Sequence, residues 1–261
     1  RRGGLLTSAL LLWVCSSPVA GYVSSRNYKF LRGLAWMQNT MATALGFPLV
    51  VGAAFVCMEV ALWQEGSSAA VGYSTLFTLL FLLFGVAVPL TFVGSYFGYS
   101  AEALKPPVHT NLIPRAIPHQ PWFLHPLVCL PLAAVLPFLA LSPVVRTLMD
   151  SVWLHEATYD IYGCLAVAMM LLLFTCAAVS VLVCYAQLAH EDYNWWWRSF
   201  VTSGACAGYV MLYAAWYHVG QGALQGGSAG AVLLYYSTML VVSVAMFTTA
   251  GSVGLMACYG F

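Results

Sequence analysis

The sequence contains very few charged residues. Lysine, arginine, aspartate and glutamate make up 7% of its 261 residues, whereas 62% are hydrophobic. A water-soluble domain carries about 25% charged residues, so this composition excludes an ordinary soluble fold. The formal net charge of +1 is also too small to indicate a nucleic-acid partner.

Motifs for catalysis and metal binding are missing as well. The chain has no glycine-rich phosphate loop, no nucleophile elbow and no His-Glu-x-x-His sequence. Its eight cysteines never occur as Cys-x-x-Cys and mostly fall inside apolar runs, where we interpret them as small packing residues. His155 and Glu156 are adjacent, but one such pair does not make a metal site. We therefore expect no enzyme activity, no cofactor and no metal.

Long apolar runs are what the sequence does contain. About 20 apolar residues cross the hydrocarbon core of a bilayer as a helix. We therefore predict an all-α, polytopic membrane helix bundle that forms a single transmembrane domain over residues 1–261. The expected spans, about seven in number, are Gly3–Val23, Thr40–Trp63, Tyr73–Phe97, Pro126–Met149, Ile161–Ala186, Phe200–Gly220 and Ala231–Cys258.

The few basic residues predict the orientation of the chain. Basic residues concentrate in cytosolic loops of membrane proteins. Exceptions are Arg1, Arg2 and Arg146, the last of which we expect to pair with Asp150 one turn later. We predict a lumenal start and a cytosolic C-terminus for this chain. Three alternate loops hold lysine or arginine, namely 24–39, 98–125 and 187–199, and the opposite loops 64–72, 150–160 and 221–230 hold none.

The densest polar and aromatic stretch lies between the fifth and sixth expected spans. One interpretation is an aromatic belt at the membrane surface, with Arg198 reaching lipid headgroups. The other is a latch in which Glu191, Asp192 and Arg198 pair and orient the two flanking helices. The predicted interface and anchor residues are Glu191, Asp192, Trp195, Trp196, Trp197 and Arg198.

Two Gly-x-x-x-Gly pairs predict close contacts between helices. Gly94 with Gly98, and Gly204 with Gly208, each allow another helix backbone to approach. The partner helix belongs either to this chain or to another membrane protein.

The prolines have two predicted roles. In the long loop 99–125 they favour a stiff, extended cytosolic strap. Inside the spans, Pro89, Pro137 and Pro143 indicate either packing kinks or the broken helices of a transport site. The predicted strap residues are Pro107, Asn111, Pro114, Arg115 and Pro118.

These motifs together resemble a known family, the nonaspanins or transmembrane 9 superfamily (EMP70 family). The resemblance rests on the EDYNWWWRSFVTSG stretch of Glu191–Gly204 and on the proline strap of Pro107–Pro118. It also includes the Gly21-Tyr22-Val23-Ser24 and Leu136-Pro137-Phe138 sequences, and it covers essentially the whole chain.

The resemblance implies a large lumenal domain followed by nine spans, of which this chain would be the last seven. The chain begins with Arg1 and no methionine, so we expect it to be part of a longer protein. Relatives often place acidic or amide groups where this chain has Val144, and a glutamate where it has Ala178. These apolar replacements favour a helix-binding or structural role over transport.

We therefore expect an integral protein of Golgi and endosomal membranes that helps to sort or deliver other membrane proteins by recognising their transmembrane helices. Its expected partners are the lipid bilayer and the helices of client proteins. The alternatives are a small-solute or ion transporter, and a structural subunit of a larger membrane complex.

Overall fold

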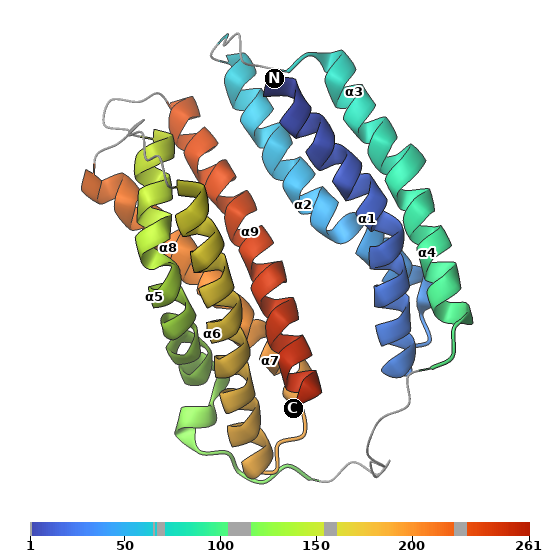
Figure 1. Cartoon of the computed structure of the whole chain (residues 1–261), viewed down its shortest axis with the longest axis vertical. Coiled ribbons are helices and arrows are strands. Elements are labelled where there is room, and N and C mark those ends of the chain that lie inside the picture. Colours follow the sequence, from blue (N-terminus) through green and yellow to red (C-terminus); the bar gives the residue numbers. More distant parts are fainter. Residues whose placement is uncertain (1, 65, 67–70, 104–115, 154–160, 222–228) are drawn as a thin grey trace. The chain divides into compact units, whose positions relative to one another are not determined.

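A computed structural model describes residues 2–64, 66, 71–103, 116–153, 161–221 and 229–261. Within these ranges the chain is almost entirely helical and contains no strand (Figure 1). The elements are α1 (Arg2–Phe30), α2 (Trp36–Gln64), α3 (Tyr73–Phe81), η1 (Leu82–Ala87), α4 (Val88–Ser100), η2 (Trp122–Leu124), α5 (Pro126–Trp153), α6 (Ile161–Ala189), α7 (Trp195–Gly204), α8 (Cys206–Gln221) and α9 (Ala229–Gly260).

Six helical segments among the described residues are long and apolar enough to cross a membrane. This confirms the all-α, polytopic class predicted from the apolar runs. The segments are Thr7–Phe30, Trp36–Gln64, Tyr73–Ser100, Pro126–Asp150, Gly163–Ala189 and Ala229–Gly260.

The prediction that Phe200–Gly220 forms one continuous membrane-spanning helix is wrong. This segment is divided into α7 and α8, and the break lies at Ala205. The Ala205 carbonyl accepts a hydrogen bond at 3.0 Å from the Gly208 N–H, three residues later, so the backbone tightens at the start of α8. Gly204 and Gly208 flank the break, and glycine weakens a helix interior.

The chain divides into two compact units, Arg1–Leu112 and Ile113–Phe261. In the first unit, α1 packs along α4 through residues with little or no side chain. A Cβ added to Gly21 would lie 2.2 Å from the Thr91 carbonyl oxygen, and one on Gly94 would lie 1.9 Å from the Pro18 carbonyl oxygen. The two helices therefore meet backbone to backbone, as small residues allow in membranes.

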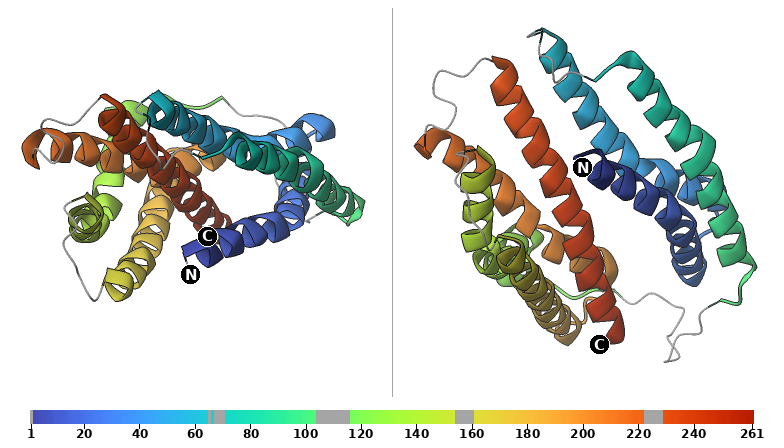
Figure 2. Two further views of the ribbon diagram at one scale, coloured as in Figure 1. Left: turned by 90° about the horizontal axis from the view of Figure 1, so that it is seen from above. Right: turned by 45° about the horizontal axis from the view of Figure 1, so that its top comes forward.

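The segment before α4 is a π-helix, η1, which precedes Pro89 near the start of α4. Proline lacks the N–H needed to continue the α-helical pattern, and a π-helical turn is one way to accommodate this. The elements α3, η1 and α4 still run as one rod (Figure 2). By contrast, α5 continues through Pro131, Pro137 and Pro143 as one helix.

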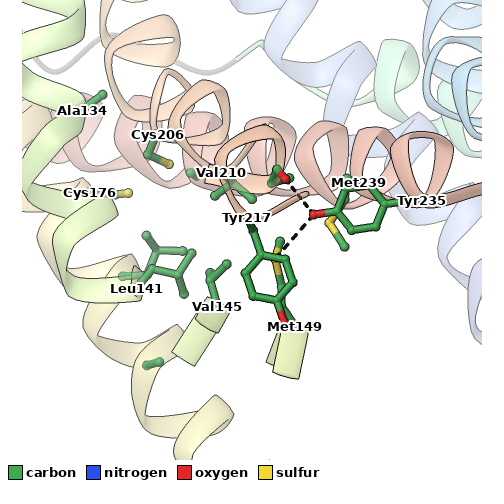
Figure 3. Close-up of a cluster of buried hydrophobic side chains, with 14 residues drawn as sticks. Ala134, Leu141, Val145, Met149, Cys176, Cys206, Val210, Tyr217, Tyr235 and Met239 are labelled. Carbon is green, nitrogen blue, oxygen red and sulfur yellow. Dashed lines mark hydrogen bonds between the residues drawn. The ribbon is translucent and has the colours of Figure 1, made fainter. Parts of the chain in front are cut away.

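The second unit has its core between α5, α6, α8 and α9 (Figure 3). Its members are apolar and at most 8% exposed. The expectation of a single transmembrane domain stays a prediction. The core consists of Ala134, Leu141, Val145, Met149, Ala168, Leu172, Cys176, Cys206, Val210, Ala214, Tyr217, Tyr235, Met239 and Ala250.

Candidate functional site

The polar loop begins where α6 ends. Glu191 has φ of 60°, a left-handed conformation that is uncommon for residues other than glycine. Its N–H donates to the Leu188 carbonyl at 3.0 Å, and the Asp192 N–H donates to the Gln187 carbonyl at 3.1 Å. This is a Schellman motif, which satisfies the last carbonyls of α6 and reverses the chain toward α7.

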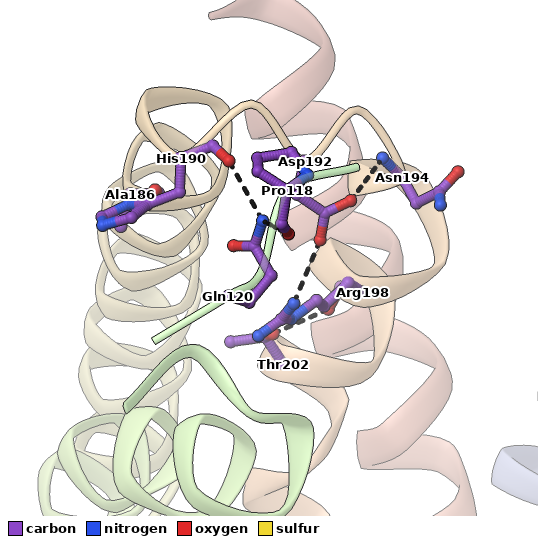
Figure 4. A network of polar contacts seen from close by, with 8 residues as sticks. All are labelled: Pro118, Gln120, Ala186, His190, Asp192, Asn194, Arg198 and Thr202. Carbon is purple, nitrogen blue, oxygen red and sulfur yellow. Dashed lines mark hydrogen bonds and ion pairs between the residues drawn. The ribbon is translucent and has the colours of Figure 1, made fainter. Parts of the chain in front are cut away.

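Asp192 and Arg198 meet at the start of α7 (Figure 4). Arg198 Nη1 lies 3.4 Å from Asp192 Oδ2, and the two side chains are only 13% and 11% exposed. Asp192 Oδ1 also accepts the Asn194 backbone N–H at 3.1 Å. Of the three residues in the predicted latch, the structure brings these two together, whereas Glu191 is exposed.

A third side chain completes this contact from α6. Gln187 is fully buried, and with its amide oxygen turned toward Arg198 it accepts from Nε at 3.1 Å and from Nη1 at 3.0 Å. The Arg198 guanidinium therefore joins α6, the loop and α7. Sequence reasoning missed Gln187, because a glutamine within an apolar run carries no signal about its partner.

A second residue that sequence reasoning missed, Gln120, joins the segment before α5 to this loop. Its Nε2 donates to the Pro118 carbonyl at 3.1 Å and to the His190 carbonyl at 3.0 Å (Figure 4). The rings of Phe123 and His190 also meet edge to face, with centroids 5.7 Å apart. The 116–125 segment is thus held against the end of α6.

The three tryptophans differ in their surroundings. Trp195 is partly buried, and its ring centroid lies 6.5 Å from that of Tyr259 in α9. Trp196 and Trp197 are 37% and 73% exposed. Their role as anchors at a membrane surface stays a prediction.

Of the predicted strap, only Pro118 falls in the described part of the chain, where it is exposed. Pro107, Asn111, Pro114 and Arg115 lie outside the described residues.

The predicted glycine pairs lie in different surroundings. Gly94 and Gly98 face α1, and a Cβ on Gly98 would lie 2.6 Å from the Tyr22 carbonyl oxygen. Gly204 is covered by the Phe247 ring of α9, which would lie 2.7 Å from an added Cβ. Only Gly208 of the four is open, with nothing within 4 Å of an added Cβ. Three of the four glycines therefore serve contacts within the chain.

Further polar contacts join helix ends. Lys29 Nζ donates to the Tyr99 and Ala101 carbonyls at 2.8 Å each, so the last turn of α1 caps the end of α4. In unit 2, Asp150 near the end of α5 accepts a hydrogen bond from the Tyr217 hydroxyl of α8 at 2.8 Å. Arg146 lies 3.9 Å from Asp150, the i,i+4 pair predicted from the sequence.

These contacts connect helices and contain no recognisable catalytic arrangement. Among the described residues, no group of three or more histidine, cysteine, aspartate or glutamate side chains could hold a metal ion.

Comparison with known proteins assigns the family. The family model for endomembrane protein 70 (EMP70) matches residues 1–226. Transmembrane 9 superfamily member 10 of Arabidopsis thaliana is 43% identical over 260 residues, which cover all of this chain and 40% of that protein. Transmembrane 9 superfamily member 2 of Homo sapiens is 39% identical over 260 residues, which cover all of this chain and 39% of that protein.

The similarity extends to fungi, since a Transmembrane 9 superfamily protein of Schizosaccharomyces pombe is 35% identical over 261 residues. No solved structure matches the chain. The chain spans about 40% of the length of these relatives. With a match over most of its length to the family model, the chain belongs to the EMP70 family, the transmembrane 9 superfamily.

Proposed function

We propose that this protein is a non-enzymatic component of Golgi and endosomal membranes that sorts or delivers other membrane proteins by binding their transmembrane helices. The observation that carries the proposal is the match of residues 1–226 to the endomembrane protein 70 family, together with relatives that are similar over the whole chain. The apolar helices among the described residues are consistent with it, because their exposed faces can contact only lipid or another helix.

The best candidate surface for a client helix is one face of α8. Gly208, Leu212, Trp216 and Val219 are all exposed, and their spacing places them on one side of the helix. The open backbone at Gly208 allows another helix to approach closely, with van der Waals contact over the neighbouring apolar side chains. Gly204 does not share this role because Phe247 covers it.

In this proposal the start of the chain is lumenal and its C-terminus is cytosolic. The basic residues at the end of α1 and the start of α7 support this orientation. Trp197, which is 73% exposed, would then lie at the cytosolic membrane surface and fix the depth of α7.

The test replaces the open glycine in the full-length protein. Gly208→Leu fills the proposed contact at a position where an added Cβ has nothing within 4 Å, so the protein should fold while client recovery falls severalfold. Gly163→Leu is the matched control, because Gly163 is also exposed and open. The measurement is quantitative mass spectrometry of membrane proteins that co-purify with each tagged variant after gentle solubilisation.

Equal client recovery from the two variants would contradict the proposal. A fixed set of partners at unit stoichiometry, unaffected by either change, would instead identify a structural subunit of a larger complex.

The break between α7 and α8 keeps transport as a second candidate, because discontinuous helices form substrate sites in many transporters. The packing around the break favours the first candidate, since Cys206 is only 1% exposed within the core of unit 2. Solute flux into liposomes that contain the purified protein, reduced by Cys206→Trp, would favour transport.

A further inference from the structure

The helices of unit 1 recur in the same order within unit 2. The first helix of each set, α1 and α6, has 29 residues, and Ile161 follows Arg2 by 159 positions. Trp195, which begins α7, follows Trp36, which begins α2, by the same 159 positions. The α3–α4 rod and α9 end 160 positions apart, at Ser100 and Gly260.

The turns after α1 and α6 have the same unusual backbone geometry. Arg32 has φ of 57° and Glu191 has φ of 60°, and both occupy the left-handed position of a Schellman motif. The Gly33 N–H donates to the Tyr28 carbonyl at 3.0 Å, as the Asp192 N–H donates to the carbonyl of Gln187. Since non-glycine residues rarely adopt this conformation, its occurrence at matched positions supports a common arrangement.

Side-chain contacts also correspond. The ring centroids of Trp36 and Tyr99 lie 6.5 Å apart, and those of Trp195 and Tyr259 lie 6.5 Å apart. Thr43 donates to the carbonyl four residues earlier at 2.8 Å, and its counterpart Thr202 does the same at 2.7 Å. The two units therefore share one three-helix repeat: α1, α2 and α3–α4 in the first, and α6, α7–α8 and α9 in the second.

Among the described residues, unit 2 contains one long helix more than this repeat, namely α5, which precedes α6 along the chain. It packs against α6, α7 and α8 and supplies one side of the unit 2 core. The residues that contribute to this core from α5 are Ala134, Leu141, Val145 and Met149 (Figure 3).

In unit 1, no helix among the described residues covers the corresponding face. Ala168 is 5% exposed in this core, whereas its counterpart Ala9 in α1 is exposed. Val210 is 2% exposed, and its counterpart Val51 in α2 is only partly buried. Because each pair has the same residue type, the difference comes from the missing neighbour and not from the side chain.

The largest difference occurs beside the break in α7–α8. Cys206 is 1% exposed, and its counterpart in α2, Phe47, is 42% exposed. A bulky aromatic side chain thus stands on the uncovered face of α2, about 17 Å along the helix from Trp36, which is near the middle of a bilayer.

The chemistry of the face indicates what covers it. In unit 2, Tyr209 donates to the Pro131 carbonyl of α5 at 3.1 Å, and Tyr217 donates to Asp150 of α5. The counterparts in α2 are Val50 and Met58, which have no hydroxyl to donate. At these two positions α2 therefore offers another helix apolar surface for van der Waals packing.

We propose that this face of α1 and α2 binds a membrane-spanning helix of the same polypeptide, one that precedes α1 in the longer protein as α5 precedes α6. The repeat specifies both the position and the sequence order of this helix. The relatives supply the necessary length, since this chain spans about 40% of theirs. The membrane part of the longer protein then contains two four-helix repeats, one in each unit.

Site-specific photo-crosslinking in the full-length protein, in its native membrane, tests this. A photoreactive phenylalanine analogue, p-benzoylphenylalanine, replaces Phe47 in one variant and Phe84 in the control. Phe84 is likewise an exposed phenylalanine, 54% exposed, but it lies in η1 on the neighbouring rod. Both replacements are conservative at exposed positions, so both variants should fold.

The expected result is an intramolecular crosslink from position 47 to an apolar peptide N-terminal to residue 1, in severalfold higher yield than from position 84. Mass spectrometry identifies the crosslinked peptide, and gel mobility shows whether the mass has increased. A crosslink from position 47 to a different protein, to a second copy with doubled mass, or to lipid alone would overturn the proposal. None of these outcomes depends on Gly208. A negative result in the crosslinking experiment therefore leaves the proposal of client binding untouched, and the reverse also holds.

Discussion

Asp192 and Arg198 form an ion pair that is largely shielded from water, since their side chains are 11% and 13% exposed. Two charges in such a place are stable only when each has partners, because desolvation of an unpaired charge costs several kcal/mol. Asn194 and Gln187 supply further hydrogen bonds to the aspartate and the arginine respectively. The pair therefore fixes the angle between α6 and α7 more than it adds net stability.

We predict that Asp192→Asn destabilises the protein by about 3 kcal/mol, because it leaves the Arg198 guanidinium without a counter-ion. The double variant Asp192→Asn with Arg198→Gln should recover part of this loss, since it removes the stranded charge. Thermal unfolding of the purified full-length protein in detergent measures both effects.

Glu102→Gln provides the control, because Glu102 is exposed and a surface substitution changes stability by about 0.5 kcal/mol or less. If Asp192→Asn and Glu102→Gln lower the unfolding temperature equally, the ion pair does not have the role assigned to it.

At the scale of elements, α1 and α4 are joined by the closest helix contact that the described glycines reveal. The backbone of α4 at Gly94 lies against the carbonyl of Pro18, and Gly98 lies against that of Tyr22. A methyl group at either glycine would meet backbone atoms, which cannot rotate away as a side chain can.

Gly94→Ala should therefore separate α1 from α4 and destabilise the protein by about 1–3 kcal/mol, the usual cost of overpacking. Gly208→Ala is the matched change, since nothing lies within 4 Å of an added Cβ there. Thermal unfolding and protease resistance of the two variants should differ clearly. Equal stability would show that the α1–α4 contact is looser than described.

The positions of the membrane-spanning helices could largely be predicted from the sequence, because their apolar runs are long and separated by polar residues. The break at Ala205 could not, since alanine is the best helix former and the run continues through it. The buried contact of Gln187 with Arg198 was hidden for a related reason. Hydropathy describes which residues avoid water. It does not show that Gln187 and Arg198, which are 11 positions apart, become neighbours through the turn between α6 and α7.

The same distinction applies to the glycine pairs. Their spacing predicts that a helix approaches closely, but spacing does not say which helix. The structure assigns Gly94 and Gly98 to α1, assigns Gly204 to α9 and leaves Gly208 open.

For the molecule as a whole, the basic loops predict which ends of the helices face the cytosol. The turn that contains Leu34, which is 93% exposed, follows α1 and carries basic neighbours. Gly66 lies on the opposite side of the membrane if α2 crosses it.

We predict that an inserted glycosylation acceptor segment is modified after Gly66 and not after Leu34, since the modifying enzyme acts on the lumenal side. Gel mobility before and after glycosidase treatment of the full-length protein in cells measures this. A glycan on the Leu34 insertion would reverse the proposed orientation.

The packing of α1 on α4 also affects how the protein is made. Lys29 receives its carbonyl partner from Tyr99, which is synthesised 70 residues later. At about 5–20 residues per second, α1 waits roughly 4–14 s before the helix that covers it exists. During that interval Gly21 and Lys29 face lipid or the insertion machinery without their neighbours in α4. α1 therefore stays without α4 for that interval at the translocon, and a slow codon between α1 and α4 would prolong its exposure.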